Sequence, residues 1–94
     1  MPVAGADSLD GVWQVRRRSG MLPPLLGVRK RIEGARGWTT VGPVHWPFVV
    51  VGLELHYHRP FRGVVDLLCP DGEGYLGRAT VRGRPVGSFR MTRA

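Results

Sequence analysis

The sequence predicts an all-β fold, a small antiparallel up-and-down β-barrel of about eight strands, and three observations support this prediction. Short stretches of alternating apolar and polar residues recur at intervals of roughly 8–12 residues, which is typical of small barrels and sandwiches. The 14 glycines and 8 prolines interrupt any long helix. Closely spaced turn signals favour hairpins between consecutive strands, and closure into a barrel removes the exposed strand edges.

We interpret residues 9–17 as the first strand. Gly11, Trp13 and Val15 alternate along it with more polar positions, and the two sets point to opposite faces of a strand. We expect Trp13 to fill one end of a small core, beside the space that Gly11 leaves.

Seven further strands are expected, each ended by glycine, proline or a turn sequence. Residues 44–47 are expected to form a loop, because Gly42-Pro43 ends the strand before them and Pro47 interrupts the chain. The expected strands are 28–33, 38–41, 48–51, 53–58, 61–69, 75–82 and 86–93.

The segment 21–26, from Met21 to Leu26, follows the first strand. It is mostly large and apolar, yet its two prolines are incompatible with a central strand or a helix interior. We expect this loop to act as a lid over one mouth of the barrel or as a partner contact, including a contact between two copies of the chain.

Alternation within the strands predicts which side chains face the interior. In the strand 61–69 we place Val65, Leu67 and Cys69 inside. We favour an Asp66 that faces outward and pairs with an arginine, and the alternative is an inward, functional Asp66. The predicted interior set, which would also contact a ligand, is Trp13, Val15, Val28, Ile32, Leu55, Tyr57, Val65, Leu67, Tyr75, Phe89 and Met91.

Length and composition limit the class of protein. The 94 residues are expected to form one barrel domain over 9–94, preceded by a flexible tail over 1–8. No apolar run approaches the roughly 18 residues of a membrane span, and residues 1–8 do not resemble a signal peptide. The single cysteine cannot form an internal disulfide, so a cytoplasmic location is the expectation.

The net charge of +7 comes from thirteen arginines and one lysine against seven acidic residues, and this arginine usage is typical of GC-rich genomes such as those of actinobacteria. The densest basic clusters are 16–18 and 29–31, and Trp38, Trp46 and Tyr57 could stack on bases. The aromatic and basic residues do not interleave on one face, however, so a nucleic acid is not the expected partner.

Gly11-Val12-Trp13, preceded by Leu9-Asp10, resembles the G-x-W signature on the first strand of the calycins, the lipocalin-like and fatty-acid-binding-like barrels. The resemblance implies that Trp13 closes the base of the barrel. It further implies that a basic residue of the last strand, Arg90 or Arg93, stacks across the indole in a cation–π contact.

Three functions remain open from the sequence. The leading one is binding of a small hydrophobic or aromatic molecule inside the barrel, with no cofactor. The first alternative is a barrel enzyme such as a cyclase or isomerase, and the second is a basic nucleic-acid or protein-partner module. The enzyme would draw on four candidate catalytic residues, Lys30, Tyr57, Asp66 and Tyr75.

Lys30, between Val28 and Ile32, could face inward and bind a ligand carboxylate, but we favour the interpretation that its ammonium reaches water at the end of the strand. His56 and His58 could share a metal only with a third ligand, for which His45, Glu54 and Asp66 are candidates. Both histidines fall on the predicted outer face, so no metal site is expected.

Overall fold

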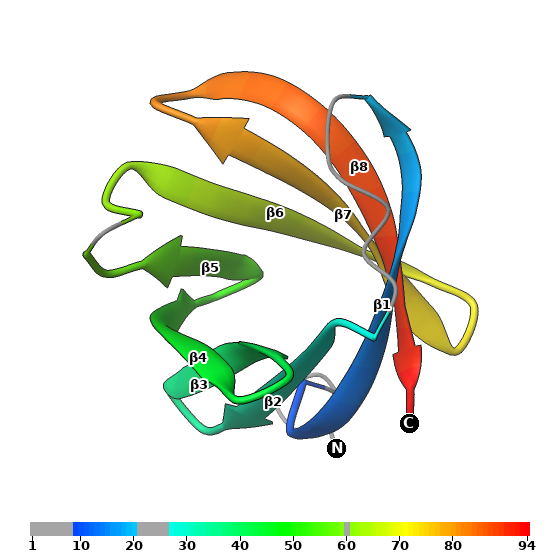
Figure 1. The fold of residues 1–94 in the computed structure, drawn as a ribbon. Coiled ribbons are helices and arrows are strands. Elements are labelled where there is room, and N and C mark those ends of the chain that lie inside the picture. Colours follow the sequence, from blue (N-terminus) through cyan, green and yellow to red (C-terminus); the bar gives the residue numbers. More distant parts are fainter. Residues whose placement is uncertain (1–8, 21–26, 60) are drawn as a thin grey trace.

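The computed structural model describes residues 9–20, 27–59 and 61–94 as one closed antiparallel barrel in which every strand pairs with its neighbours in the chain and β8 pairs with β1 (Figure 1). The predicted all-β, eight-stranded up-and-down barrel is confirmed. The predicted tail 1–8 and the predicted lid 21–26 lie outside the described residues. The strands are β1 Gly11–Gly20, β2 Arg29–Glu33, β3 Arg36–Val41, β4 Val44–Val51, β5 Glu54–Tyr57, β6 Val64–Asp71, β7 Gly74–Val81 and β8 Arg84–Arg93.

Tight turns connect most of the hairpins. Gly34 and Gly72 each stand first in a two-residue turn with φ of +66° and +62°. A positive φ at this position is the geometry of type II′ hairpins, whose twist matches that of the strands they join and which glycine adopts without strain. The sequence therefore carries directly the turns that join consecutive strands, whereas the barrel closes through the pairing of β1 with β8.

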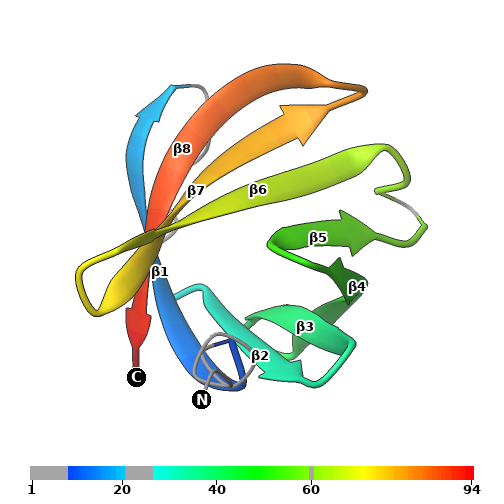
Figure 2. The same ribbon diagram turned by 180° about the vertical axis from the view of Figure 1, so that it is seen from behind.

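The two ends of the barrel differ. The turns 34–35, 52–53 and 72–73 lie at one end, together with the start of β1 and the end of β8 (Figure 2). The turns 42–43 and 82–83 and the connection from β5 to β6 lie at the other end. We call these the closed end and the open end, because side chains fill the first and a pocket lies in the second.

The prediction of a loop over 44–47 is wrong, since these residues belong to β4. Pro47 is the Cα partner of Trp38 on β3, and its carbonyl accepts a hydrogen bond of 3.2 Å from the backbone N–H of His58, just beyond β5. The N–H and C=O of one residue point to the same neighbour in antiparallel sheets. Proline has no N–H, and at position 47 that group would point to β5 at the end of the β4–β5 ladder. The strand therefore accommodates Pro47 without losing a hydrogen bond inside the ladder.

The predicted facing of β6 is also wrong. Asp66 is the Cα partner of the buried residues Leu55 and Ala79, and directly paired residues share a face. Asp66 therefore points inward, and the alternation turns Leu67 and Cys69 outward, where both are exposed. Val64 and Leu68 take the inward positions that we expected Val65 and Leu67 to fill.

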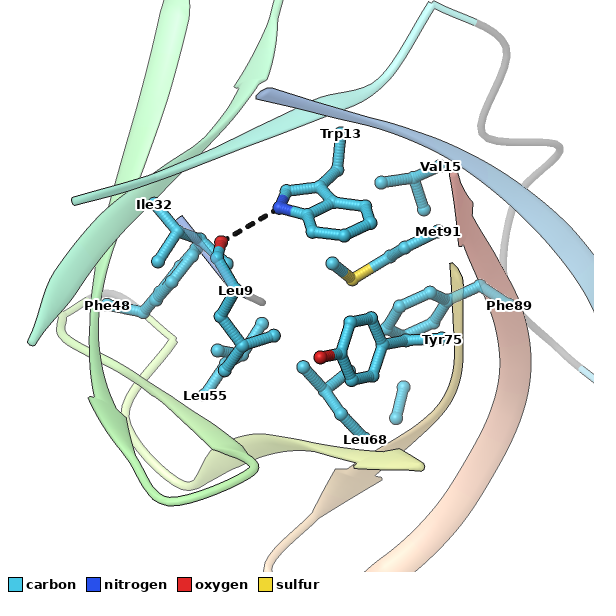
Figure 3. Packing of buried hydrophobic residues seen from close by; sticks show 11 residues of the cluster. Leu9, Trp13, Val15, Ile32, Phe48, Leu55, Leu68, Tyr75, Phe89 and Met91 are labelled. Atoms are coloured by element: carbon cyan, nitrogen blue, oxygen red, sulfur yellow. Dashed lines mark hydrogen bonds between the residues drawn. The ribbon is translucent and has the colours of Figure 1, made fainter. Parts of the chain in front are cut away.

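The core fills the closed end and extends to the wall of the open-end pocket (Figure 3). Trp13 is 1 % exposed, donates from Nε1 to the carbonyl of Leu9 at 2.9 Å, and meets Tyr75 edge-to-face at 5.4 Å. Other strands contribute inward side chains to the same cluster. The cluster consists of Leu9, Trp13, Val15, Ile32, Phe48, Leu55, Leu68, Tyr75, Ala79, Phe89 and Met91.

Arg93 seals this end from outside. Its guanidinium carbon lies 4.3 Å from the centroid of the Trp13 ring, and its Nη1 donates to the carbonyl of Asp10 at 2.8 Å. A Cβ on Gly11 would lie 2.8 Å from that Nη1, and φ there is +128°, so glycine leaves the space that the guanidinium occupies. The predicted stack on Trp13 is therefore made by Arg93, whereas Arg90 bonds Asp71.

Two phenylalanine rings lie over glycines of the paired strands. A Cβ on Gly37 would come within 2.8 Å of the Phe48 ring, and a Cβ on Gly77 within 2.2 Å of the Phe89 ring. Because the glycines have no side chain, both rings can lie flat against the barrel wall. Both rings also flank the ammonium group of Lys30, at 5.6 and 5.3 Å from their centroids.

Candidate functional site

A pocket of about 180 Å³ lies in the open end of the barrel. Every one of the eight strands contributes at least one wall residue, so the pocket is surrounded by the barrel wall. Trp46 and Phe61, which meet edge-to-face at 5.3 Å, form part of its rim. The lining residues are Val15, Val28, Lys30, Thr39, Trp46, Tyr57, Phe61, Val64, Asp66, Ala79 and Phe89.

A larger hollow of about 850 Å³ lies over the outer face of β1 to β4. Its wall includes Arg29, Arg31 and Trp38, and Arg31 already pairs with Glu33 at 2.9 Å. All of its wall residues are exposed or half-buried. The interior pocket is the better candidate site, since buried ionisable groups converge there in a surface enclosed by apolar side chains.

Lys30 is the centre of a buried polar cluster in the pocket wall. Its Nζ donates to Thr39 Oγ1 at 2.7 Å and to Tyr57 Oη at 2.5 Å, and lies 3.2 Å from Asp66 Oδ2. The Tyr57 hydroxyl donates to the same Asp66 oxygen at 3.2 Å. The side chains of Lys30 and Asp66 are 4 % and 5 % exposed. We call Lys30, Thr39, Tyr57 and Asp66 the Lys30 cluster.

The cluster forms because four strands each turn one polar side chain inward. On β2 and β3, alternation with buried neighbours selects Lys30 and Thr39, which are direct Cα partners. Tyr57 ends β5, and Asp66 lies on β6. The charge of Lys30 or of Asp66 alone would be unfavourable in this apolar interior. Because the two side chains form an ion pair, each charge compensates the other.

The electrostatics of the cluster favour a protonated, charged Lys30. Burial by itself lowers the pKa of Lys30, but the attraction of Tyr57 and Asp66 and their hydrogen bonds outweigh burial and raise the pKa above its ordinary value of 10.5. Burial raises the pKa of Tyr57 above 10.0, although the neighbouring ammonium acts in the opposite direction. Near neutral pH the cluster therefore contains an ammonium and a neutral phenol.

This geometry corrects two sequence-based interpretations. Lys30 does not extend to water, and Asp66 does not face outward towards an arginine, because the two residues bind each other inside the barrel. An ammonium with a raised pKa is a poor nucleophile, and this one already donates to Thr39 and Tyr57 and pairs with Asp66. The alternative of an enzyme, with Lys30, Tyr57, Asp66 and Tyr75 as catalytic residues, stays a prediction.

The predicted ligand contacts divide into three groups. Val15, Val28, Tyr57 and Phe89 line the pocket, as does Lys30, which stood outside the predicted interior set. The residues placed in the filled closed end are Trp13, Ile32, Leu55, Tyr75 and Met91. Val65 and Leu67 do not line the pocket, since β6 turns Asp66 and its alternate neighbours inward.

Sequence reasoning missed five wall residues: Thr39, Trp46, Phe61, Val64 and Ala79. Thr39 could have been found from the alternation Gly37-x-Thr39, with Gly37 as its inward companion. Trp46 was missed because residues 44–47 were predicted to form a loop. Val64 was missed because the inner and outer faces of β6 were predicted the wrong way round. No local signal placed Phe61, which lies in the connection before β6.

His56, on β5, and His58, which follows β5, take no part in this pocket. His56 Nε2 lies 2.8 Å from Glu54 Oε1 on the outside, and His58 is exposed. Across residues 9–20, 27–59 and 61–94, no group of three or more His, Cys, Asp or Glu side chains gathers as a metal site would require.

The basic and aromatic residues considered for nucleic-acid stacking are divided between the two faces of the wall. Residues 16–18, Arg29 and Arg31 are exposed, and Trp38, the Cα partner of Arg31, also faces outward. Trp46 and Tyr57 instead line the interior pocket.

Fold and site define a small closed antiparallel barrel with one sealed end and an interior pocket that contains a buried ion pair. In the parts of the chain that the structure describes, no helix is long and apolar enough to cross a membrane. Comparison of the chain with protein-family models, with curated proteins and with solved structures finds no match.

Proposed function

We propose that the protein binds a small, mainly apolar molecule in the open-end pocket. The observation that carries the proposal is the pocket itself, a hollow of about 180 Å³ walled by all eight strands. An apolar cavity of about 150 Å³ is large enough to bind benzene. The volume therefore suits a molecule the size of a single ring with a small substituent.

The chemistry of the wall supports a ligand of this kind. Val15, Val28, Val64 and Phe89 offer apolar surface, and binding gains free energy from the apolar area that it removes from water. Trp46 adds an aromatic face at the rim. A ring-sized ligand would bury most of its surface among these groups while one edge contacts the Lys30 cluster.

The resemblance to calycins supports the same proposal. The closed eight-stranded barrel is compatible with that group of folds, and Arg93 stacks on Trp13 as the G-x-W signature implies. Sealing one end of a barrel leaves the opposite end as the route by which a ligand enters. We therefore propose a calycin-like binding protein with a smaller cavity than a drug-sized ligand would need.

The test is an NMR titration of the full chain with toluene and indole, followed by backbone amide shifts. We expect saturable shifts at Thr39, Trp46 and Val64, with none at the closed end. Val64→Phe fills the pocket and should weaken binding at least tenfold. Leu67→Phe is the matched control, because it introduces the same ring on the exposed face of β6 and should leave binding unchanged.

Two results would overturn the proposal. One is the absence of saturable binding by either probe at millimolar concentration. The other is equal loss of binding in Val64→Phe and Leu67→Phe, which would show that the shifts arise from the outer surface.

A further inference from the structure

The contacts of Lys30 balance the charge of this ammonium within the cluster. Its Nζ donates to Thr39 Oγ1 at 2.7 Å and to Tyr57 Oη at 2.5 Å, and it lies 3.2 Å from the carboxylate oxygen Oδ2 of Asp66. A carboxylate entering the pocket would therefore find the cation already neutralised. A buried anion without a free countercharge is strongly unfavourable.

The two hydroxyl groups of the cluster are committed in the same way. The Tyr57 hydroxyl donates to Asp66, so it can only accept from its other neighbours. Thr39 Oγ1 accepts from Lys30 and lies 2.5 Å from Tyr57 Oη, to which it can donate. With these bonds made, neither hydroxyl group offers a free donor to the pocket.

Asp66 is different, because its two carboxylate oxygens are used unequally. Oδ2 pairs with the Lys30 ammonium and accepts a hydrogen bond from the Tyr57 hydroxyl. Oδ1 makes no hydrogen bond with any residue in 9–20, 27–59 or 61–94. Within the same residues, no fully enclosed side-chain nitrogen or oxygen lacks a partner. The unpartnered Oδ1 is therefore not fully enclosed, and the space that the buried Asp66 side chain reaches is the pocket that it lines.

We infer that the pocket selects neutral, ring-sized ligands that carry a hydroxyl or N–H group, which donates to Oδ1 of Asp66, and that it discriminates against carboxylates. This inference rests on the proposed function and adds the class of ligand. The charges of Lys30 and Asp66 cancel within the cluster, so the bound ligand needs no charge of its own. Its donor would replace the water that otherwise hydrates Oδ1.

Phenol, toluene and benzoate form a series that tests this selectivity on the wild-type chain near neutral pH. Phenol and toluene have nearly the same shape, but only phenol has a donor. A hydrogen bond to a charged acceptor should make phenol bind about tenfold or more tightly than toluene. Benzoate should show no saturable binding in the pocket.

The paired variant Lys30→Met/Asp66→Leu removes the acceptor without leaving an unpaired charge. It should retain toluene binding and lose the preference for phenol. Thr40→Val, on the outer side of β3, is a control that should keep the preference. The comparison of the three probes on wild-type protein decides the question even if the paired variant does not fold.

The outcomes separate this inference from the proposed function. Equal affinity for phenol and toluene, tighter binding of benzoate, or a phenol preference that survives in the paired variant would overturn the ligand class alone. Failure of phenol, toluene and indole to bind saturably would overturn the proposed function, and the ligand class with it.

Discussion

Replacement of Lys30 by methionine tests the most consequential interaction in the barrel. Methionine keeps most of the length and volume of the lysine stem between Phe48 and Phe89, so the main loss is the charge. Asp66 then remains 4 % exposed with no cation at 3.2 Å. Removing one partner of a buried ion pair typically costs about 3–5 kcal/mol.

The variant Lys30→Met/Asp66→Leu removes both charges and should recover most of that loss. Apolar replacement of a whole buried pair is often neutral or stabilising, and the remaining cost is the lost hydrogen bonds of Tyr57, about 1 kcal/mol. Urea unfolding followed by far-UV circular dichroism at neutral pH gives the free energies of unfolding. A destabilisation of Lys30→Met below about 1 kcal/mol, or a double variant as unstable as the sum of the single variants, would refute the reasoning.

The same variants have an expected pH dependence. The pKa values of Lys30 and Tyr57 are raised above 10.5 and 10.0 in the folded protein, so the native state holds these protons more tightly than the unfolded chain does. This stabilisation is complete below the unfolded values and is lost as the pH rises through the folded ones. The free energy of unfolding should therefore fall from about pH 10 upward, and less steeply in Lys30→Met/Asp66→Leu. Parallel curves for the two proteins would contradict this assignment.

Three further predictions concern packing and exposure. Gly77→Ala would place a Cβ 2.2 Å from the Phe89 ring, so it should destabilise the barrel by about 1–3 kcal/mol in urea unfolding, and an unchanged midpoint would contradict the packing. Arg93→Ala removes the stack at 4.3 Å on Trp13 and should cost about 1–2 kcal/mol, with a red shift of tryptophan emission as the seal opens; no shift would argue against the seal. Cys69→Ser should change stability by less than about 0.5 kcal/mol, and the Cys69 thiol should react with a thiol reagent in the native protein, because it is exposed; protection from the reagent would refute that placement.

Much of the fold could be predicted from local patterns. Alternation on the first strand correctly turned Trp13 and Val15 inward. Alternation on the second strand put Lys30 on the same face as Val28 and Ile32, but the favoured interpretation, an ammonium that reaches water, was wrong. Glycine and proline signals located most of the turns. The loop predicted over 44–47 failed because the position of Pro47 at the end of a ladder is set by the neighbouring strand β5.

The site was less predictable than the fold, and the reason is the reversed facing of β6. Val65, Leu67 and Cys69 look like an inward set by hydrophobicity, and an acid among them looks like a surface residue. The apolar residues on both faces of this strand leave its facing ambiguous. The ammonium of Lys30 on β2 resolves this ambiguity, because it makes an inward Asp66 favourable.

The sequence by itself determined that the chain forms a closed barrel of short strands, with Trp13 at one end and an arginine of the last strand over it. These features follow from periodicity, turns and one motif, all of which act over a few residues. Only the tertiary structure decided that Lys30 and Asp66 meet in the pocket wall. Each charge is unfavourable inside the barrel when alone, so its placement depends on a partner brought to it by the register of strands that are distant in the sequence.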